Sequence, residues 1–133
     1  MQFTFEKAFG VHEPALHLQS KRAQLLAANV SNADTPKFKA RDIDFTQALA
    51  DSIRYAKSGG PLVATNVRHI QPPAFLNGYE ILFRQPRQPS IDGNTVETEA
   101  EMSAFMDNSV RYMASLRFLG GKMQTLQKAI GGQ

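Results

Sequence analysis

The sequence predicts a mainly α-helical protein in which long N- and C-terminal helices pack as a coiled-coil hairpin around a small, loop-rich insert. Two observations predict the helices, because apolar residues recur at helical spacing both before residue 33 and after residue 96. A third predicts the insert, since six of the seven prolines lie between these two stretches. We therefore divide the chain into an N-terminal helical segment at 1–32, an insert at 33–96 and a C-terminal helix at 97–133. The first and last segments are expected to form one helical domain.

The first long helix is predicted over 14–31, and a shorter helical piece is predicted over 4–9. Pro14 fits a helix start, where its missing N–H is not needed. Asn32 favours a left-handed residue at the helix end, and Pro36 disfavours helix at the residue before it. The apolar seam of this helix follows steps of seven, three and four: Leu16, Ala23, Leu26 and Val30.

The insert contains one amphipathic stretch and one hairpin signal. Residues 45–56 predict a short helix, because their apolar side chains recur on one face. That face consists of Phe45, Leu49 and Ile53. Residues 77–78 are Asn-Gly, a favoured two-residue turn, and they lie between short apolar runs at 75–76 and 79–83. The insert is therefore expected to hold a short helix and a possible β-hairpin, with too few apolar residues to fold firmly alone.

The C-terminal helix is predicted over 98–130 and would be roughly 50 Å long at 1.5 Å per residue. Asp92, Gly93 and Asn94 predict a turn before it, and Thr98 with Glu101 predicts a capping box at its start. Its seam follows heptad spacing: Met102, Met106, Met113, Leu116, Met123 and Ile130. Ser109, Gly120 and Gln127 occupy the remaining seam positions and weaken it.

The two long helices differ in length, which predicts self-association or docking to another chain. The N-terminal helix would span only about 27 Å, so it cannot cover a seam of roughly 50 Å. We therefore expect another subunit or another chain to cover part of the seam.

Composition excludes most catalytic and metal sites. The chain has no Cys, so disulfides, thiolate zinc sites and cysteine nucleophiles are excluded. His12, His17 and His69 are too scattered for a metal-ligand pattern, and no P-loop, nucleophile elbow or dinucleotide motif occurs. We expect no cofactor, no metal and no enzymatic activity.

The sequence also predicts neither a membrane-spanning helix nor a cleaved signal peptide. No run approaches the ~20 apolar residues that a membrane helix needs. Residues 1–7 carry an acid and a base where a signal peptide has a cationic patch and then an apolar core, so we expect no cleaved secretion signal.

Two charged segments leave alternatives open. Asp42 and Asp44 could bind Mg²⁺, but acids before the apolar positions of a helix are more typical of its N-terminal turn. The basic stretch 37–41, which includes Phe38, could contact phosphate or simply form a solvated loop. A net charge of +3 is too small to argue for nucleic acid by itself. The alternative function that these features leave is a small cytosolic adaptor or a nucleic-acid-binding module.

Residues 27–39 resemble the signature of flagellar axial proteins, the family of rod, hook and hook-associated proteins. That signature is a helix end followed by A-N-x-x-N-x-x-T-P-G-Y, and here Lys37 stands in place of the Gly and Phe38 in place of the Tyr. The matching motif loop contributes Asn29, Asn32, Asp34, Thr35, Pro36 and Phe38. Asn29 and Asn32 are expected to end the helix and fix the register of the neighbouring loop, or Asn32 simply caps the helix.

Further segments resemble the proximal rod members of that family. They are 88–96, 99–102, 108–112 and 128–132, and the chain length agrees. The resemblance implies a structural subunit of the proximal rod of the bacterial flagellar basal body. That rod is a hollow drive shaft in the periplasm, and it joins the inner-membrane ring to the distal rod.

The same resemblance implies partners and a route of export. The partners would be copies of the chain itself, other rod proteins, the ring-to-rod adaptor, the inner-membrane ring and the export gate, with no nucleic acid. The terminal helices would line the innermost layer of the rod. Export would use the flagellar type III apparatus without a cleaved leader, and the protein would be needed for flagellum assembly and motility.

Overall fold

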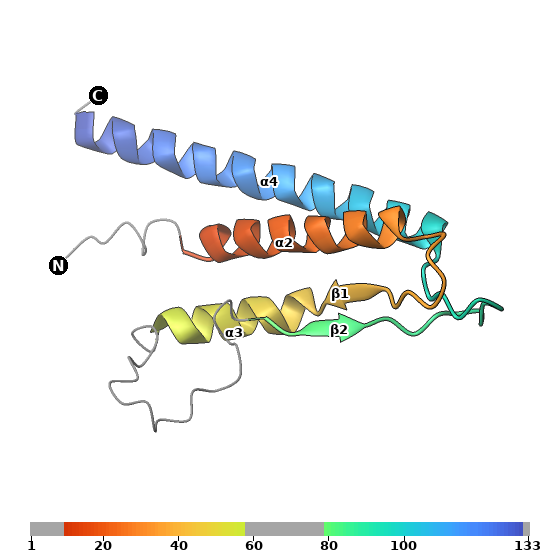
Figure 1. Ribbon diagram of the computed structural model, residues 1–133. Coiled ribbons are helices and arrows are strands. Elements are labelled where there is room, and N and C mark those ends of the chain that lie inside the picture. The colour runs from red at the N-terminus through yellow and green to blue at the C-terminus, as the bar shows by residue number, and fades with distance from the viewer. Residues whose placement is uncertain (1–9, 58–78, 132–133) are drawn as a thin grey trace, which may run out of the picture.

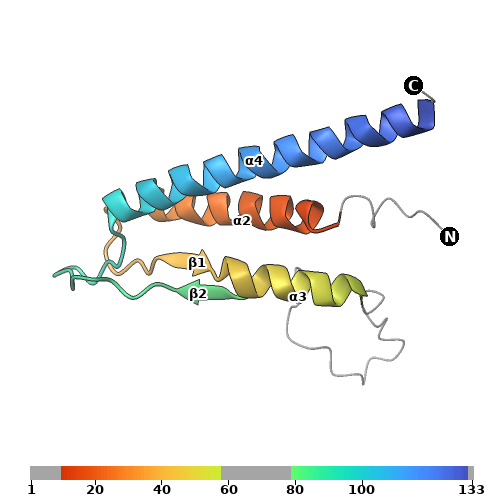
Figure 2. The same cartoon turned by 180° about the vertical axis from the view of Figure 1, so that it is seen from behind.

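The computed structural model describes residues 10–57 and 79–131, and within them helices and strands lie in three layers (Figure 1). The elements in chain order are α2 (His12–Ser31), β1 (Arg41–Ile43), α3 (Phe45–Lys57), β2 (Ile81–Phe83) and α4 (Thr98–Gly131). α2 is the middle layer, with α4 on one side and α3, β1 and β2 on the other, and Figure 2 shows the same order from behind. The mainly α-helical class is therefore confirmed.

α2 and α4 lie side by side and run in opposite directions (Figures 1 and 2). α2 begins two residues before the predicted start, so Pro14 lies in its first turn, where a proline is tolerated. The 20 residues of α2 span about 30 Å and the 34 residues of α4 about 51 Å, so α4 continues past the start of α2. The predicted overhang is confirmed, whereas the predicted helical piece at 4–9 lies outside the described residues.

The hydrophobic core lies between α2 and the layer of α3 and β1. Leu18 of α2, Ile43 of β1 and Ala48 of α3 are buried together. Four partly buried apolar residues pack against them: Leu25, Phe45, Leu49 and Tyr79. The short helix predicted over 45–56 is confirmed as α3, and its apolar face closes this core.

The α2–α4 contact, by contrast, includes buried polar residues of both helices. The buried residues of α4 are Glu101 and Asn108, and α2 buries Gln19 and Asn29 in addition to three apolar residues. The six predicted seam residues of α4 are all exposed, so the expectation that they pack on the N-terminal helix is wrong for the single chain. Polar contacts near the start of α4 therefore lie on the side that faces α2, and the apolar seam is exposed.

The two strands form a small antiparallel sheet whose pairing the sequence does not predict. Arg41 lies opposite Phe83, Asp42 opposite Leu82 and Ile43 opposite Ile81. The strand within 79–83 is confirmed, but its partner is β1, which precedes α3 in the chain, and the predicted Asn-Gly turn lies outside the described residues. The pairing joins segments that are far apart in the sequence, and contacts with α2 hold β1 in place.

Candidate functional site

Asn29 joins three elements through its side-chain amide. Its Nδ2 donates to the Arg41 carbonyl oxygen (2.8 Å) and to Glu101 Oε2 (3.0 Å), and its Oδ1 accepts from the Arg41 N–H (3.0 Å). These two bonds to Arg41 repeat the pattern that a neighbouring strand would make, so Asn29 covers the outer edge of β1. Asn29 is buried, and it therefore ties the end of α2 to both β1 and α4.

Two arginines and two carboxylates form an ion-pair network beside Asn29. Arg22 donates to both oxygens of Asp42, through Nε (2.8 Å) and Nη2 (3.0 Å). Arg84, directly after β2, donates to Asp42 Oδ2 (2.5 Å) and to Glu101 Oε1 (2.9 Å). The four formal charges cancel, so the network can lie among packed elements without an uncompensated charge.

The same network sets the protonation of Asp42. Burial alone would raise the pKa of Asp42, but hydrogen bonds from Arg22, from Arg84 and from the Ile43 N–H lower it below its ordinary value of 3.8. The hydrogen bond to Asp42 also raises the pKa of Arg22, against the opposing effect of burial. Asp42 is therefore held as a carboxylate at neutral pH and connects the two arginines.

The motif loop and the turn before α4, predicted separately, meet in space. The Asn94 Nδ2 atom donates to the carbonyl oxygens of Asn32 (3.1 Å), Ala33 (2.6 Å) and Thr35 (3.0 Å), and Asn94 is buried. The predicted turn is confirmed, because Asp92 Oδ1 accepts from the Asn94 N–H (3.0 Å). This turn therefore holds the loop that follows α2.

Backbone pairing extends this contact along residues 37–40. The Lys37 N–H donates to the Asp92 carbonyl oxygen (3.0 Å), and the Thr95 N–H donates to the Phe38 carbonyl oxygen (3.0 Å). Lys37 has φ +63°, in the left-handed region that the glycine of the family signature favours. The chain therefore keeps the turn of that signature with a residue that adopts it at a cost in free energy.

Three predictions about this region need correction. Asn32 has φ −106° and is not left-handed; it ends the helix through Nδ2, which donates to the Ala28 carbonyl oxygen (2.8 Å). The capping box is wrong, because Thr98 already lies inside α4 and both carboxylate oxygens of Glu101 are bound by Asn29 and Arg84. Asp42 is an ion-pair residue of β1 and does not belong to the turn that starts α3.

Other predictions for these residues are confirmed. Asp44 lies at the start of α3, where its Oδ1 accepts from the Gln47 N–H (3.1 Å), as the helix-turn interpretation predicts. Asn29 fixes the register of the segment that follows the helix, as the first alternative predicts. Asn32 caps the helix, as the second alternative predicts. Among the other motif-loop residues, Asp34 and Pro36 are exposed, Phe38 is half-buried, and the Thr35 hydroxyl donates to Asn32 Oδ1 (3.1 Å).

The six predicted seam residues of α4 form an exposed apolar band, here called the methionine stripe. Their exposed fractions range from 47% for Met102 and Met123 to 84% for Ile130. The predicted seam residues of α2 are more covered, since Leu26 is fully buried and the others are half-buried. The methionine stripe consists of Met102, Met106, Met113, Leu116, Met123 and Ile130.

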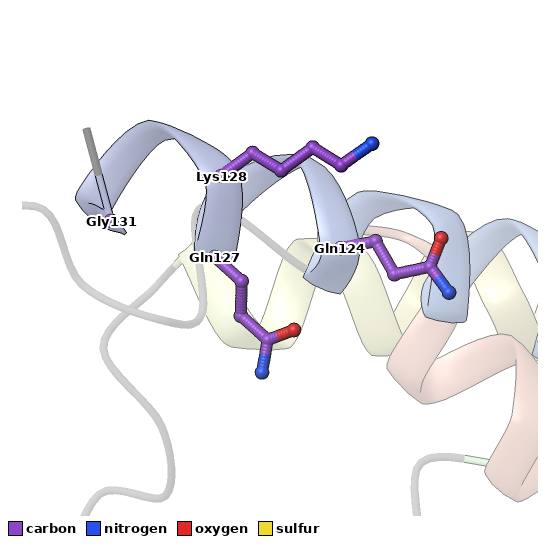
Figure 3. Close-up of a pocket in the computed structure, with 4 residues that line it drawn as sticks. All are labelled: Gln124, Gln127, Lys128 and Gly131. Carbon is purple, nitrogen blue, oxygen red and sulfur yellow. The ribbon is translucent and has the colours of Figure 1, made fainter. Parts of the chain in front are cut away.

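Two hollows on α4 lack converging functional groups. The first, of about 300 Å³, lies along the last turns of α4, where the side chains of Gln124, Gln127 and Lys128 diverge (Figure 3). The second, of about 620 Å³, lies between 84–97 and the first turns of α4. Most of its charged lining groups already have partners; for example, Glu97 Oε1 accepts a hydrogen bond from the Arg87 N–H (2.6 Å).

Residues 10–57 and 79–131 bring no three His, Cys, Asp or Glu side chains together as a metal site. Within these ranges, no helix combines the length and the apolar character needed to cross a bilayer.

Sequence reasoning missed Arg22, Arg84 and Asn108. Arg22 interrupts the apolar period of the first helix and Arg84 ends an apolar run, but nothing local shows that both reach Asp42. Asn108 falls within a segment that resembles the proximal rod proteins, and its Nδ2 donates to the Gln19 carbonyl oxygen (2.8 Å). A buried polar residue among apolar heptads is the available signal for such a contact.

Comparison with known proteins gives full-length relatives. A protein of Aeromonas hydrophila named flagellar basal body rod protein FlgB is 43% identical over 134 residues, covering 100% of this chain and 99% of the relative. Proteins with the same name from Proteus mirabilis and Salmonella typhimurium are 40% and 37% identical. They cover 94% and 96% of this chain, and 94% and 95% of their own lengths. No family model matches the chain.

Proposed function

The chain belongs to the FlgB family of flagellar basal body rod proteins and is a structural subunit of that rod, and from this premise we propose that the methionine stripe joins it to neighbouring subunits. The observation that carries this proposal is the exposure of six large apolar side chains along one helix. A row of exposed apolar side chains of this kind marks an interaction site more often than a solvated face.

The length of α4 supports the same assignment. α4 continues past the start of α2, so α2 cannot shield its C-terminal turns (Figure 1). Burying one Met or Leu side chain stabilises an assembly by about 1.5–3 kcal/mol. Several such contacts per subunit would offset the entropy lost when subunits are fixed in a rod.

Parts of α2 and of the motif loop provide a second contact. Leu16, Ala23 and Val30 are half-buried, and their remaining surface belongs to the same assembly interface. The motif loop presents Asp34 and Pro36 outward, and we assign this tip to an adjacent subunit. Leu26 is fully buried and acts in the fold of the subunit itself.

The subunit takes the proximal position in the rod, in the periplasm, next to the inner-membrane ring. Its partners there are copies of itself, other rod proteins, the ring-to-rod adaptor, the inner-membrane ring and the export gate. It reaches this place through the flagellar type III apparatus without a cleaved leader, and its two terminal helices line the hollow shaft as a coiled coil. The support for these finer points is the resemblance of 27–39 and 88–96 to axial and proximal rod proteins.

Comparison with known proteins lends no support to the alternative, an adaptor or nucleic-acid-binding module. The relatives described above all carry the name of a rod protein. In the basic stretch 37–41, the Lys39 ammonium already donates to the Gly93 carbonyl oxygen (3.1 Å). Lys39 therefore has a structural use that does not require phosphate.

Mixing the purified chain with its rod partners tests the proposal directly. We expect electron microscopy to show tubes that form at high concentration and disappear when Met106 and Met113 are both replaced by Lys. Equal replacement of Ala114 and Gln124, which are exposed residues of α4 outside the stripe, is the matched control. Persistence of the tubes in the Met106→Lys, Met113→Lys variant would contradict the proposed interface. Steeply salt-dependent binding to DNA or RNA without tubes would favour the alternative.

A further inference from the structure

α4 has two different faces, and the less apolar one meets α2. Glu101 and Asn108, seven residues apart, lie on the same side of the helix, and each is 1% exposed. The methionine stripe begins at Met102, about 100° around the helix from Glu101. Hydrophobic burial alone would favour the opposite arrangement, with the stripe against α2 and the polar residues in water.

Glu101 holds the first turns of α4 in this rotation. Its Oε2 accepts from Asn29 Nδ2 of α2 (3.0 Å), and its Oε1 accepts from Arg84 Nη1 (2.9 Å). Both oxygens of the carboxylate are used, and both donors are anchored by other contacts, Asn29 to Arg41 and Arg84 to Asp42. Turning α4 would remove a buried carboxylate from both donors at once.

Asn108 holds the same face two turns further along. Its Nδ2 donates to the backbone carbonyl oxygen of Gln19, in the middle of α2 (2.8 Å). A buried Asn in a helix pair specifies orientation and register at a cost in stability, because other arrangements leave its amide without a partner. Asn108 therefore fixes both the rotation of α4 and its position along α2.

The interface also contains a polar atom that packing does not satisfy. Gln19 is 4% exposed, and its Oε1 has no hydrogen-bond partner among the described residues. Buried polar atoms in proteins are nearly always paired. A helix pair arranged for stability alone would not combine this atom with an exposed apolar stripe, so the arrangement favours one orientation over maximal stability.

We propose that Glu101 and Asn108 select the face of α4 that meets α2, and so keep the methionine stripe outward for neighbouring subunits. The use of the stripe rests on the proposed function, whereas the selection of the face is a property of the single chain. Without the two polar contacts, α4 turns by about a third of a revolution and buries Met106 and Met113 against α2.

Methionine oxidation in the full-length monomer measures this rotation. Four of the five methionines lie on the stripe, so peroxide oxidation followed by mass spectrometry reports its accessibility residue by residue. In the wild-type structure, Met106 and Met113 are 63% and 65% exposed. Covering them to about 20% would slow their oxidation about threefold, the result we expect for Glu101→Ala combined with Asn108→Ala.

Two further variants keep this result specific. Asp107→Ala with Arg111→Ala removes an exposed ion pair from the same helix and should leave the oxidation rates unchanged. Adding Met106→Lys to the Glu101→Ala, Asn108→Ala variant puts a charge on the stripe, which opposes burial and should return Met113 to the wild-type rate. Light scattering must show monomers throughout, because aggregation would also protect methionines.

Unchanged oxidation of Met106 and Met113 in a helical, monomeric Glu101→Ala, Asn108→Ala variant would overturn the proposal. If that variant loses its circular dichroism signal, the single variant Asn108→Ala replaces it in the test, because it removes only one uncharged hydrogen bond. Slower oxidation of Met113 must then appear in Asn108→Ala. The outcome is separate from the test of the proposed function. Failure of wild-type chains to form tubes would disprove the use of the stripe and leave the oxidation result standing.

Discussion

Side-chain amides take the place of backbone partners at two buried positions. Asn29 pairs with the backbone of Arg41 as a third strand would, and Asn94 collects the carbonyl oxygens of the loop after α2. Between them, Lys37 adopts a left-handed backbone. Single residues therefore decide how the chain leaves α2, and two predictions belong to this scale.

Replacing Asn29 by Ala should destabilise the fold much more than replacing Asn32 by Ala. Asn29→Ala removes three hydrogen bonds at a buried site, and we expect a loss of about 2–3 kcal/mol in the free energy of unfolding. Asn32→Ala removes exposed capping bonds and should cost about 0.5–1 kcal/mol. Urea unfolding followed by circular dichroism measures both. Equal losses would contradict the different roles assigned to the two residues.

Lys37→Gly should stabilise the fold, because Gly adopts a φ of +63° without the steric cost that Lys has there. The expected gain is at most about 1 kcal/mol, since Gly also increases the entropy of the unfolded chain. Lys37→Ala is the control, because it removes the same side chain and keeps the strain. A gain of the same size in Lys37→Ala, measured by thermal unfolding, would show that backbone strain is not the cause.

At the scale of elements, α2 is the part that α3, β1 and α4 all contact. Its α3 side is held by the apolar contacts of Leu18, whereas its α4 side is held by hydrogen bonds of Asn29 and Gln19. The Arg22–Asp42–Arg84–Glu101 network then joins α2, β1, the end of β2 and α4 in one chain of ion pairs. The network therefore links the docking of α4 on α2 to the small sheet.

Acid should weaken this connection through Asp42. Because its pKa in the folded protein lies below 3.8, the unfolded chain takes up the proton first as the pH falls. The stabilisation is complete above about pH 4 and is lost as the pH falls through the folded pKa. Asp42→Asn should be less stable than wild type by about 3 kcal/mol at neutral pH, and the difference should narrow in acid.

Thermal unfolding of wild type and Asp42→Asn across this pH range measures that difference. Asp34→Asn changes an exposed carboxylate of the motif loop and serves as the control, which should follow the wild type. A difference between wild type and Asp42→Asn that stays constant down to pH 2 would show that the Asp42 charge does not stabilise the network.

For the whole molecule, we propose that folding and assembly use different apolar surfaces. The core between α2 and α3 closes within one chain, while the methionine stripe stays exposed along a helix that its partner cannot cover (Figure 1). A subunit built in this way can fold by itself and still retain a large surface for its neighbours. Substitutions can therefore separate the two properties.

Leu116→Glu and Leu26→Glu should both abolish motility, for different reasons. Leu26 is fully buried, so Leu26→Glu places a charge in the fold and should cost several kcal/mol of stability. Leu116 is 51% exposed, so Leu116→Glu should leave the unfolding transition of the monomer nearly unchanged and prevent assembly only.

Swimming assays in the source bacterium, with unfolding of the purified variants, measure both effects. Ala114→Glu introduces the same charge at an exposed α4 position on another face and should preserve swimming. Normal swimming of the Leu116→Glu strain would remove the stripe from the assembly interface, and a stable Leu26→Glu monomer would remove Leu26 from the core.

Local patterns in the sequence determined the helices, their ends and the family of the protein, because helix period, prolines and the signature at 27–39 act over short stretches of chain. They also determined that α4 is too long for α2 to cover. Only the tertiary structure decided which face of α4 meets α2, that β2 pairs with β1, and that Arg22, Asp42, Arg84 and Glu101 form one network. Residues up to 89 positions apart make these contacts, as in Gln19–Asn108. Hydrophobic period identifies an apolar face without specifying its partner, so the polar contacts that orient α4 appear only once the chain is folded.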